Sequence, residues 1–406
     1  MKCVKNRIAA MLLILLALYG GYQLGQARAE WEYRDAVIPE GVDTDTGQTL
    51  EKAEYLKTFI QQNYLFDTTE EEMNEGMLKG LFLSLEDPYS QYMNADEFTA
   101  LMEDNAGSFG GIGITVSPGE EDNLITVVAP IRDTPGERAG IQPGDKIIKI
   151  EGTEYTGDQM DAAVKEMRGE AGTNVNITIR RLSPERPPEE FDLEITREII
   201  NIISAQGEML NDTIGYLAIS SFDENTDRYF SNALKEIKEQ GAQGIVLDLR
   251  NNPGGLLDSV LAIADDLLPE GPVVITRTKN GQEVVERSDR KMDAIPMTVL
   301  INKGSASASE ILAGAIQDYE RAPIIGETSF GKGIVQRIIP LDDGSGFKLT
   351  VSEYYTPEER KIHEIGVVPD IEVAPPEEVL SFGPEFIDTD IQLQRAMEEL
   401  QKQIGE

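Results

Sequence analysis

Cysteine and histidine are almost absent from this sequence of 406 residues, which contains one of each, Cys3 and His363. A structural zinc site takes about four Cys or His ligands, and a catalytic one about three side chains with carboxylates counted. A cluster of Cys and His ligands is therefore excluded, and a disulfide within the chain is impossible. A hydrolase with a histidine base would have to use His363. We expect no metal and no other cofactor.

Basic side chains are scarce as well. The sequence has 36 Lys and Arg against 73 Asp and Glu, which gives a formal net charge of -37. Nucleic acids bind basic surfaces, so this balance argues against a nucleic-acid partner. The hydrophobic content of 40% and the 37 glycines fit a globular protein with many turns. The length suggests two or three domains.

The N-terminus carries a basic flank and a short apolar run. Three basic residues precede Ile8–Tyr19, and Ala27-Arg28-Ala29 offers an A-x-A cleavage site. If uncleaved, residues 8–25 are long enough for one membrane-spanning helix, which needs about 17–25 residues. We interpret residues 1–30 as a signal peptide or a membrane anchor, with a buried N-terminal helix as the alternative. The rest of the chain is then expected outside the cytoplasm.

The remaining chain divides into segments that differ in composition and in the spacing of apolar residues. Residues 31–48 are polar and turn-rich, and we interpret them as a linker. Residues 49–105 carry apolar side chains at helical spacing, with Thr68 or Thr69 as an N-cap, and predict a small helical region. Its apolar stripes would pack on the same chain or on a second copy, so a homodimer is a reasonable expectation. Residues 381–406 are predicted to form an acidic helical tail.

Residues 106–184 are rich in glycine and in short strand-like runs. The expected strands are 112–116, 124–129, 146–150 and 174–181, and the expected helix is 158–167. The segment Ser183–Pro188 contains three prolines and is predicted to be a turn-rich connector. It would lead into the next domain, residues 185–380.

From Thr213 onward, strands and helices alternate. The expected strands are 214–219, 244–249 and 297–301, with another beginning at 324, and the expected helices are 226–240, 256–268 and 309–318. A hairpin of 335–340 and 347–355 and a helix over 391–404 follow. This alternation is typical of helices layered on a largely buried sheet. The predicted fold class is a multi-domain α/β protein with a mixed sheet.

Three serines follow the predicted strand 297–301. Ser305, Ser307 and Ser309 are separated by alanines and open the next helix. The free backbone N–H groups at a helix N-terminus can stabilise an oxyanion. Serine also favours helix starts without any catalytic role, so plain capping is the alternative.

A lysine lies between two glycines in the segment Gly326–Gly333. This segment resembles a phosphate loop, G-x-x-x-x-G-K-[ST], but Gly333 occupies the place of the hydroxyl that binds magnesium. It also leads into a strand-like run and not into a helix. We therefore reject a nucleotide site. Lys332 remains, either as a functional lysine on a tightly packed loop or as a solvated surface side chain.

A turn rich in Asn and Gly follows the most apolar predicted strand. Asp248–Gly255 lies at the carboxyl end of that strand, where α/β proteins place their sites. Its two glycines can expose a backbone N–H to a reacting oxygen. A tight turn between strand and helix is the alternative interpretation.

Together, these segments offer a serine and a lysine but no suitable histidine. Ser/Lys pairs are a known variant of the nucleophile and base arrangement. The lysine must be neutral to accept a proton. Because its ordinary pKa is about 10.4, activity near pH 7 requires a pKa lowered by about three pH units, or about 4 kcal/mol, which burial can supply.

The chain resembles the C-terminal processing peptidases, or tail-specific proteases, from about Leu50 to Leu400. The motifs that carry the resemblance are Gly304–Glu310, Ser329–Gly333 with Gln336, and Leu247–Gly255. The resemblance implies that Ser307 is the nucleophile, that Lys332 is its base and that Gln336 orients the lysine. It implies oxyanion donors in the backbone of Ala308 and of Gly254 and Gly255. It also makes residues 185–380 a serine peptidase core.

Residues 106–184 are similar to a PDZ domain. Such domains add the C-terminus of a peptide as an extra strand and hold its carboxylate on backbone N–H groups. The similarity implies a carboxylate loop made of Gly110, Gly111, Ile112 and Gly113, surrounded by apolar side chains that favour apolar tails. Arg168 follows the predicted helix, where it would sense the bound carboxylate or the protease body, or act only as a cation at a helix C-terminus.

Two further residues have predicted roles outside the chemistry. Asp318 falls on a position typical of the family, and we interpret it as structural. His363 lies outside the three segments, and we expect a satisfied structural or surface histidine. Replacing it by Ala should leave catalysis largely intact, and activity should rise with pH through the lowered pKa of Lys332.

The sequence thus predicts a serine endopeptidase outside the cytoplasm that recognises apolar C-terminal tails of protein or peptide substrates. It would be attached to the membrane by its N-terminal segment or secreted. The alternative is a membrane-tethered PDZ scaffold with an inactive protease body, which binds apolar C-termini without cleaving them.

Overall fold

The described chain divides into two compact units after Met77. The computed structural model describes residues 46–119, 122–183, 186–289, 292–375 and 381–405. The predicted signal or anchor segment and most of the linker over 31–48 lie outside these residues. A search of the described helices finds none that is both long and apolar enough to span a bilayer.

The first unit contains α2 (Thr46–Asn63) and the beginning of α3 (Glu70–Leu83). The Glu72 N–H donates to Thr69 Oγ1 at 3.1 Å, and Glu72 Oε2 accepts from the Thr69 N–H at 2.7 Å. This reciprocal pair is a capping box, and it confirms Thr69 as the N-cap. The apolar stripe of α2 is exposed at Leu50, Leu56 and Phe59. A homodimer formed through such a stripe stays a prediction.

The second unit begins with elements that precede the small β domain. β1 (Gln91–Met93) is followed by α4 (Ala95–Ala106) and β2 (Ser108–Gly111), which pairs antiparallel with β9 (Glu198–Asn201). The helix α4 has a capping box at its N-cap, Asn94, and ends at Gly107 with a positive φ of 61°, a backbone conformation that glycine adopts without a Cβ penalty.

A six-stranded sheet forms the small β domain. Its strand order is β3-β4-β5-β7-β8, with β6 paired to β5. The strands are β3 (Ile114–Pro118), β4 (Ile125–Pro130), β5 (Lys146–Ile150), β6 (Thr153–Glu154), β7 (Asn174–Ser183) and β8 (Arg186–Thr196), and the helices are α5 (Pro135–Arg138), η1 (Gly157–Gln159) and α6 (Met160–Met167). Side chains at alternate positions, such as Ile177 and Ile179 of β7, fill its core.

The predicted connector at Ser183–Pro188 is wrong. β7 reaches Ser183, and β8 returns antiparallel along it from Arg186 to Thr196. Phe191, Leu193 and Ile195 lie at every second position of β8 and pack on the same core. This alternation places β8 in the small β domain in spite of Pro187 and Pro188 at its start. The domain boundary predicted at 184 therefore falls inside a hairpin, about a strand too early.

The large sheet of the second unit has the strand order β10-β11-β12-β15-β16-β19. The strands are β10 (Ala205–Met209), β11 (Ile214–Ile219), β12 (Gly244–Asp248), β15 (Met297–Ile301), β16 (Ile324–Gly326) and β19 (Ile371–Glu372). β10 is antiparallel to β11, and the remaining pairs are parallel. The predicted strands over 214–219 and 297–301 are confirmed at the same bounds.

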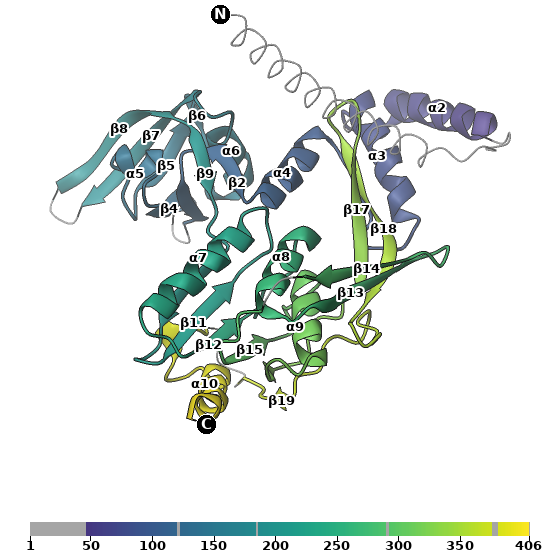
Figure 1. Cartoon of the computed structure of the whole chain (residues 1–406). Helices are drawn as coiled ribbons and strands as arrows, with labels where there is room; N and C mark the ends of the chain where they lie inside the picture. Colours follow the sequence, from purple (N-terminus) through teal and green to yellow (C-terminus); the bar gives the residue numbers. More distant parts are fainter. Residues whose placement is uncertain (1–45, 120–121, 184–185, 290–291, 376–380, 406) are drawn as a thin grey trace, which may run out of the picture. The chain divides into compact units, whose positions relative to one another are not determined.

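Helices cover both faces of the large sheet (Figure 1). On one face lie α7 (Thr226–Glu239), α8 (Leu257–Leu267) and α9 (Ala308–Asp318), and on the other lies α10 (Ile391–Gly405). Residues of β12 alternate accordingly, because Ile245 and Leu247 belong to the first core and Val246 to the second. The chain predicted as a tail, 381–406, therefore includes a helix that completes the core, with Leu393 and Leu400 fully buried.

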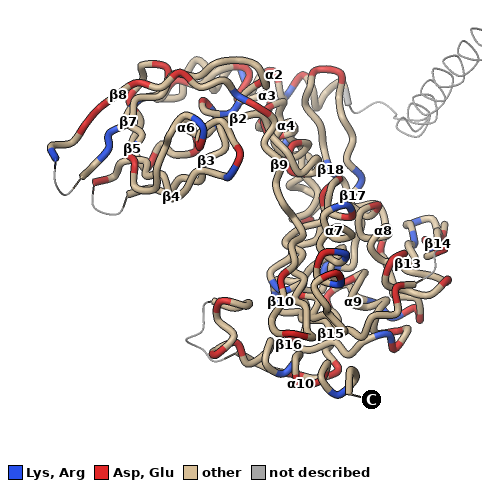
Figure 2. Tube along the Cα trace, turned by 60° about the vertical axis from the view of Figure 1, so that its left-hand side comes forward, with Lys and Arg blue, Asp and Glu red and all other residues tan. Residues whose placement is uncertain are grey.

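A second sheet of five strands lies beside these layers. It contains β1, β13 (Gly271–Thr278), β14 (Glu283–Ser288), β17 (Ile334–Pro340) and β18 (Gly346–Tyr355). The hairpin of β17 and β18 was expected, whereas β13 and β14 were not. A short 3-10 helix, η2 (Pro384–Phe386), precedes α10. The architecture confirms the predicted class, a multi-domain α/β fold with mixed sheets. Acidic residues occur on helices, strands and turns alike (Figure 2).

Truncating the buried face of α10 tests its place in the core. Leu400→Ala is expected to lower the free energy of unfolding by about 2–5 kcal/mol, because it leaves a cavity against the sheet. Gln401→Ala, on the exposed side of the same helix, is the matched control and should change it by less than about 0.5 kcal/mol. Urea unfolding followed by circular dichroism measures both. Equal values for the two variants would show that α10 is a dispensable tail.

Candidate active site

Three adjacent parallel strands bring the predicted segments together. β12, β15 and β16 are neighbours in the large sheet, and their carboxyl ends meet at one edge. β12 leads into the turn Asp248–Gly255, β15 into the three serines, and β16 into the loop that contains Lys332. Segments far apart in the sequence thus share one site, as expected for the carboxyl edge of an α/β sheet.

Ser307 is the N-cap of α9 and has a strained backbone. Its φ is 53° and its ψ is -115°, in a region that costs a non-glycine residue about 1–3 kcal/mol. The side chain is half-buried. Such strain persists only where the surrounding contacts hold the backbone, so Ser307 is a fixed feature of the turn.

The three serines have different hydroxyl partners. Ser305 Oγ donates to the Leu249 carbonyl at 2.8 Å, and Ser309 Oγ donates to the Asn252 carbonyl at 3.0 Å. Both side chains are fully buried, so they fasten the serine turn to the turn after β12. Among the described residues, the Ser307 hydroxyl donates to no such carbonyl, and in the capping box of α9 it faces the Glu310 N–H. Ser307 is therefore the one serine of the three whose hydroxyl proton is not committed to a carbonyl.

A buried carboxylate that we did not single out from the sequence joins the turn of Ser307 to the loop of Lys332. Glu310 is fully buried, and its oxygens accept four hydrogen bonds. The donors are the Ser307 N–H at 2.9 Å, Ser329 Oγ at 2.6 Å, the Gly331 N–H at 2.6 Å and the Lys332 N–H at 2.8 Å. Glu310 lies three residues after Ser307, the S-x-x-E spacing of a capping box, and this spacing was the available signal.

Tyr354 forms a second connection between the same segments. Its hydroxyl lies 3.0 Å from the Ser307 carbonyl oxygen and 2.6 Å from the Lys332 carbonyl oxygen. Burial raises the pKa of Tyr354 well above its ordinary value, and the neighbouring Glu310 adds to this effect. The phenol is therefore neutral and keeps its proton for these carbonyls.

Lys332 lies in a partly buried position. Burial is the largest effect and lowers the pKa of Lys332, and the positive charge of Lys348 lowers it further, while Asp87 and Glu310 oppose both. The Lys332 Nζ lies over the Tyr89 ring, 4.7 Å from its centroid. In the part of the chain that the structure describes, no hydrogen bond joins this nitrogen to Ser307 Oγ. The structure thus places a lysine with a lowered pKa at the site, turned toward Tyr89.

Gln336 does not bond to Lys332 in this arrangement. It pairs with Thr350 in the β17–β18 hairpin, and its Nε2 lies 3.4 Å from the Ile334 carbonyl oxygen and 3.5 Å from Thr350 Oγ1. Both distances are long for hydrogen bonds. The orienting role of Gln336 stays a prediction.

Two of the three predicted oxyanion donors are free. Neither Ala308 nor Gly255 donates its backbone N–H to a partner among the described residues. The Gly254 N–H, in contrast, donates to Asn252 Oδ1 at 2.8 Å, so its prediction as a donor is wrong for this conformation. Gly254 still has a steric role, because a Cβ there would lie 2.7 Å from Ser307 Cβ and 2.9 Å from the Ala308 nitrogen.

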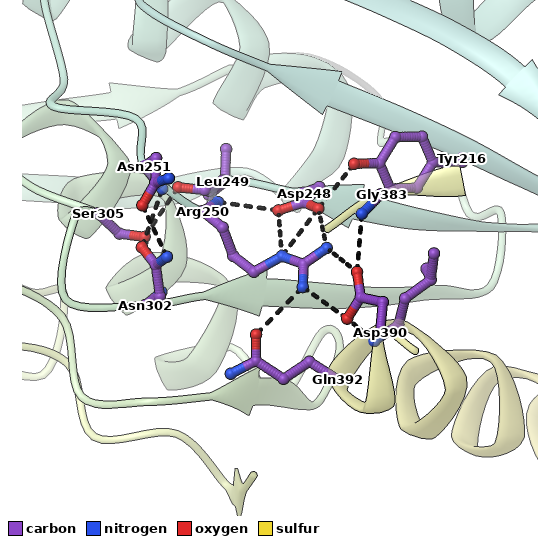
Figure 3. Close-up of polar contacts among 11 residues, drawn as sticks. Tyr216, Asp248, Leu249, Arg250, Asn251, Asn302, Ser305, Gly383, Asp390 and Gln392 are labelled. Carbon is purple, nitrogen blue, oxygen red and sulfur yellow. Dashed lines mark hydrogen bonds and ion pairs between the residues drawn. The ribbon is translucent and has the colours of Figure 1, made fainter. Parts of the chain in front are cut away.

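Arg250 anchors the turn after β12 in a buried network (Figure 3). It bonds to Asp248 on one side and to Asp390 and Gln392 at the start of α10 on the other. Tyr216 donates to Asp248 at 2.7 Å. Burial alone would lower the pKa of Arg250, but the two carboxylates raise it above its ordinary value. The network fixes the turn and connects it to the C-terminal helix.

The predicted carboxylate loop leads from β2 into the first strand of the small β domain. Gly110 and Gly111 belong to β2, while Ile112 and Gly113 bend the chain into β3, and all four are buried. Gly110 must be glycine, because a Cβ there would lie 2.1 Å from the Gly169 carbonyl oxygen. The binding of a peptide carboxylate by this loop stays a prediction.

Arg168 has partners within the chain. It follows the last residue of α6, its Nη1 donates to Glu103 of α4 at 3.2 Å, and its guanidinium lies over the Phe109 ring at 4.3 Å. Arg168 therefore connects the small β domain to α4. A role as sensor of a bound carboxylate stays a prediction.

Asp318 lies far from the serine turn, whereas His363 packs beside the Lys332 loop. Asp318 ends α9, about 16 Å along the helix from Ser307 at 1.5 Å per residue, and it is paired with Arg360, which agrees with a structural role. His363 packs its backbone against Gly333, where a Cβ would lie 2.2 Å from the His363 nitrogen. Its Nδ1 is buried and has no hydrogen-bond partner among the residues that the structure describes, so the expectation of a satisfied histidine is wrong at this atom.

The described residues contain no cluster of three or more His, Cys, Asp or Glu side chains arranged to hold a metal ion. The arrangement offers a serine hydroxyl that donates to no carbonyl, an amine with a lowered pKa, and the N–H groups of Ala308 and Gly255, unbonded within the described chain, and nucleophilic acyl transfer requires groups of these kinds.

Comparisons with family models and known proteins point in the same direction. Residues 213–373 match the model of peptidase family S41, residues 126–181 match a PDZ domain, and residues 11–97 match the N-terminal domain of the activating protease CtpB. The matched S41 range contains Ser307, Glu310 and Lys332.

Several curated proteins are similar over most of the chain. A carboxy-terminal-processing protease of Bartonella bacilliformis is 43% identical over 325 residues, covering 78% of this chain and 73% of that protein. A carboxyl-terminal-processing protease of Synechocystis is 37% identical, covering 79% and 75%. The protease CtpB of Bacillus subtilis is 35% identical, covering 84% and 71%. Among solved structures, the photosystem II D1 C-terminal processing protease is 28% identical with a TM-score of 0.48, covering 87% of this chain and 90% of that one.

Replacing the buried carboxylate tests whether it holds the two segments together. Glu310→Gln preserves size but turns one acceptor into an NH2 group that faces N–H donors. We expect a loss of about 1–3 kcal/mol in the free energy of unfolding, measured by urea denaturation. The control is Glu320→Gln, an exposed position just after the same helix. If both substitutions had the same small effect, Glu310 would not be the connection between the segments.

Proposed function

Because the chain belongs to the carboxy-terminal-processing proteases of peptidase family S41 and carries a PDZ domain, we propose that it is a serine endopeptidase with Ser307 as nucleophile and Lys332 as general base. The observation that carries the proposal is the Ser307 hydroxyl on a strained turn, which donates to no carbonyl, together with the N–H groups of Ala308 and Gly255, which have no acceptor among the described residues. The Lys332 loop is fastened to this turn through Glu310 and Tyr354.

The chemistry follows from these groups. The neutral Lys332 amine accepts the Ser307 hydroxyl proton while Oγ attacks the scissile carbonyl carbon. The Ala308 and Gly255 N–H groups stabilise the resulting oxyanion. The Lys332 ammonium then gives the proton to the leaving amine, the C–N bond breaks, and an acyl-enzyme forms. A water molecule, activated by the same amine, hydrolyses the ester and releases the second product.

Burial helps Lys332 to act as a general base at moderate pH. The pKa of Lys332 is lowered by its surroundings, so a larger share of the amine is neutral at moderate pH than for a solvated lysine. The arrangement also requires the amine to leave Tyr89 and reach Ser307 Oγ, because the two are not hydrogen-bonded in this structure. Gln336 is then available to bond to the lysine from β17.

Substrate selection is proposed to reside in the PDZ domain. Such domains bind an extended C-terminus and hold its carboxylate on backbone N–H groups, for which the loop Gly110–Gly113 is the proposed site. Apolar side chains near this loop favour apolar tails. The basic and apolar N-terminal segment supports an extracytoplasmic location, either attached to the membrane or secreted after cleavage.

A second candidate function is a PDZ scaffold with an inactive protease body. The observation that favours it is the position of the Lys332 ammonium at Tyr89 instead of at Ser307. A fluorophosphonate probe applied to the chain in the presence of an apolar-tailed peptide separates the two functions. Labelling of Ser307 supports the peptidase, whereas a chain that binds the peptide without labelling is a scaffold.

The catalytic pair is tested by removing each member. Ser307→Ala and Lys332→Ala are each expected to lower kcat/KM on an apolar-tailed peptide by roughly 10^4-fold, as losses of a nucleophile or its base do. His363→Ala is the matched control and should retain most of the activity, because its side chain has no bond to Ser307. Mass spectrometry of the cleaved peptide measures all three. Full activity without Ser307 or Lys332 would refute the assignment.

Tail recognition is tested by the peptide's own terminus. Ser307→Ala protein should bind an apolar-tailed peptide with a free carboxylate about tenfold or more tightly than the same peptide with a C-terminal amide. The amide loses the charged acceptor of the backbone N–H bonds. Calorimetric titration measures both affinities. Equal affinities would place recognition elsewhere than at the peptide's C-terminal carboxylate.

A further inference from the structure

A turn from the N-terminal part of the second unit contacts Lys332 from outside the catalytic segments. The Tyr89 ring lies under the Lys332 Nζ at 4.7 Å from the centroid, within the range of a cation–π interaction. Asp87, two residues earlier, attracts the same ammonium electrostatically. None of the matched sequence motifs around Ser307 and Lys332 includes these residues, which precede Lys332 by more than 240 positions.

The turn is held in place by its own bonds. Asp87 accepts hydrogen bonds from the Tyr89 N–H at 2.9 Å and from Ser90 Oγ at 2.5 Å. Ser90 is buried, and its Oγ accepts from the Thr350 N–H of β18 at 2.9 Å. The Tyr89 ring is therefore attached to the sheet that also carries Gln336, and its distance from Lys332 does not depend on a loose loop.

We propose that Tyr89 and Asp87 are positioning residues of the general base, which hold the Lys332 side chain away from Ser307 while it is an ammonium and release it when it becomes a neutral amine. Both contacts require the positive charge, because a neutral amine has little attraction to a ring face or to a distant carboxylate. Loss of the proton therefore frees the side chain to reach Ser307 Oγ. This inference rests on the proposed role of Lys332 as base.

The charged groups around Lys332 decide the direction of the effect. Lys348 from β18 and burial favour the neutral amine, whereas Asp87 from the turn and Glu310 from α9 favour the ammonium. The Tyr89 ring also favours the ammonium. Without Tyr89 or Asp87, the ammonium form of Lys332 is less stabilised, while Lys348 and burial still favour the neutral amine. Lys332 should therefore lose its proton at a lower pH.

The pH dependence of kcat/KM in the full chain tests the proposal. On the acidic side of the pH profile, called the acid limb here, kcat/KM of the wild type should rise with pH as Lys332 loses its proton. Tyr89→Leu and Asp87→Asn should each move this limb to lower pH by about 0.5 pH unit, which is roughly a threefold gain in activity below the midpoint. Tyr89→Phe keeps the ring face and is the matched control, with an unshifted limb. A uniform loss of activity without a shift, or a shift to higher pH, would overturn the proposal.

A second measurement does not require peptidase activity. The rate at which trace acetic anhydride acetylates Lys332, followed by peptide mass spectrometry over a pH series, gives the titration of this amine in Ser307→Ala protein. Tyr89→Leu in that background should move the titration to lower pH, and Tyr89→Phe should not. An unchanged titration would refute the positioning role even in an active enzyme. If the wild type proves to have no peptidase activity, this titration still decides the inference separately from the proposed function.

Discussion

The buried carboxylate of Glu310 is the constraint on which the site depends. A buried carboxylate without partners would be strongly disfavoured, and here four donors satisfy it, three of them from the loop after β16. The position of Lys332 relative to Ser307 is therefore set by backbone N–H groups and not by the long lysine side chain. Tyr354 of β18 joins the same two segments, because its hydroxyl lies close to the carbonyl oxygens of Ser307 and Lys332. The backbone is thus fixed, while the lysine side chain keeps its freedom to move.

The parallel sheet makes this constraint possible. Because β12, β15 and β16 are adjacent, the turns that follow them converge, and Ser305 and Ser309 join the first two turns through buried hydroxyls. Arg250 extends the arrangement to α10, so the last helix of the chain supports the turn that carries Gly255 (Figure 3). Stability of the core and geometry of the site are therefore supplied by the same residues.

The sequence predicted the layered α/β core well, because the strands of the large sheet are short apolar runs between helices with clear periodicity. The start of β8 was predicted to be a connector because its prolines are typical of turns. The alternation of apolar side chains further along β8 identifies a strand only once its pairing with β7 is known. Composition and spacing did not distinguish Ser307 from the other two serines, and the family resemblance alone pointed to it. The structure adds that the Ser305 and Ser309 hydroxyls are bonded to backbone carbonyls. The contacts of Tyr89 with Lys332 join residues far apart in the chain, and no local pattern predicts such a contact. Glu310 could have been found from its spacing, but its four partners could not.

The contacts between α4 and α6 depend on charge. Lys165 pairs with Asp96, and Arg168 pairs with Glu103, with all four side chains at least 30% exposed. Exposed ion pairs of this kind contribute little each and weaken as salt screens them, with a Debye length of about 8 Å at physiological ionic strength. The ion pairs between the small β domain and α4 are therefore sensitive to ionic strength. The hydrogen bonds around Glu310 are not, because they are buried from the ions in solution. Salt can in this way weaken the contacts of α6 with α4 while leaving the turn of Ser307 and the loop of Lys332 in place.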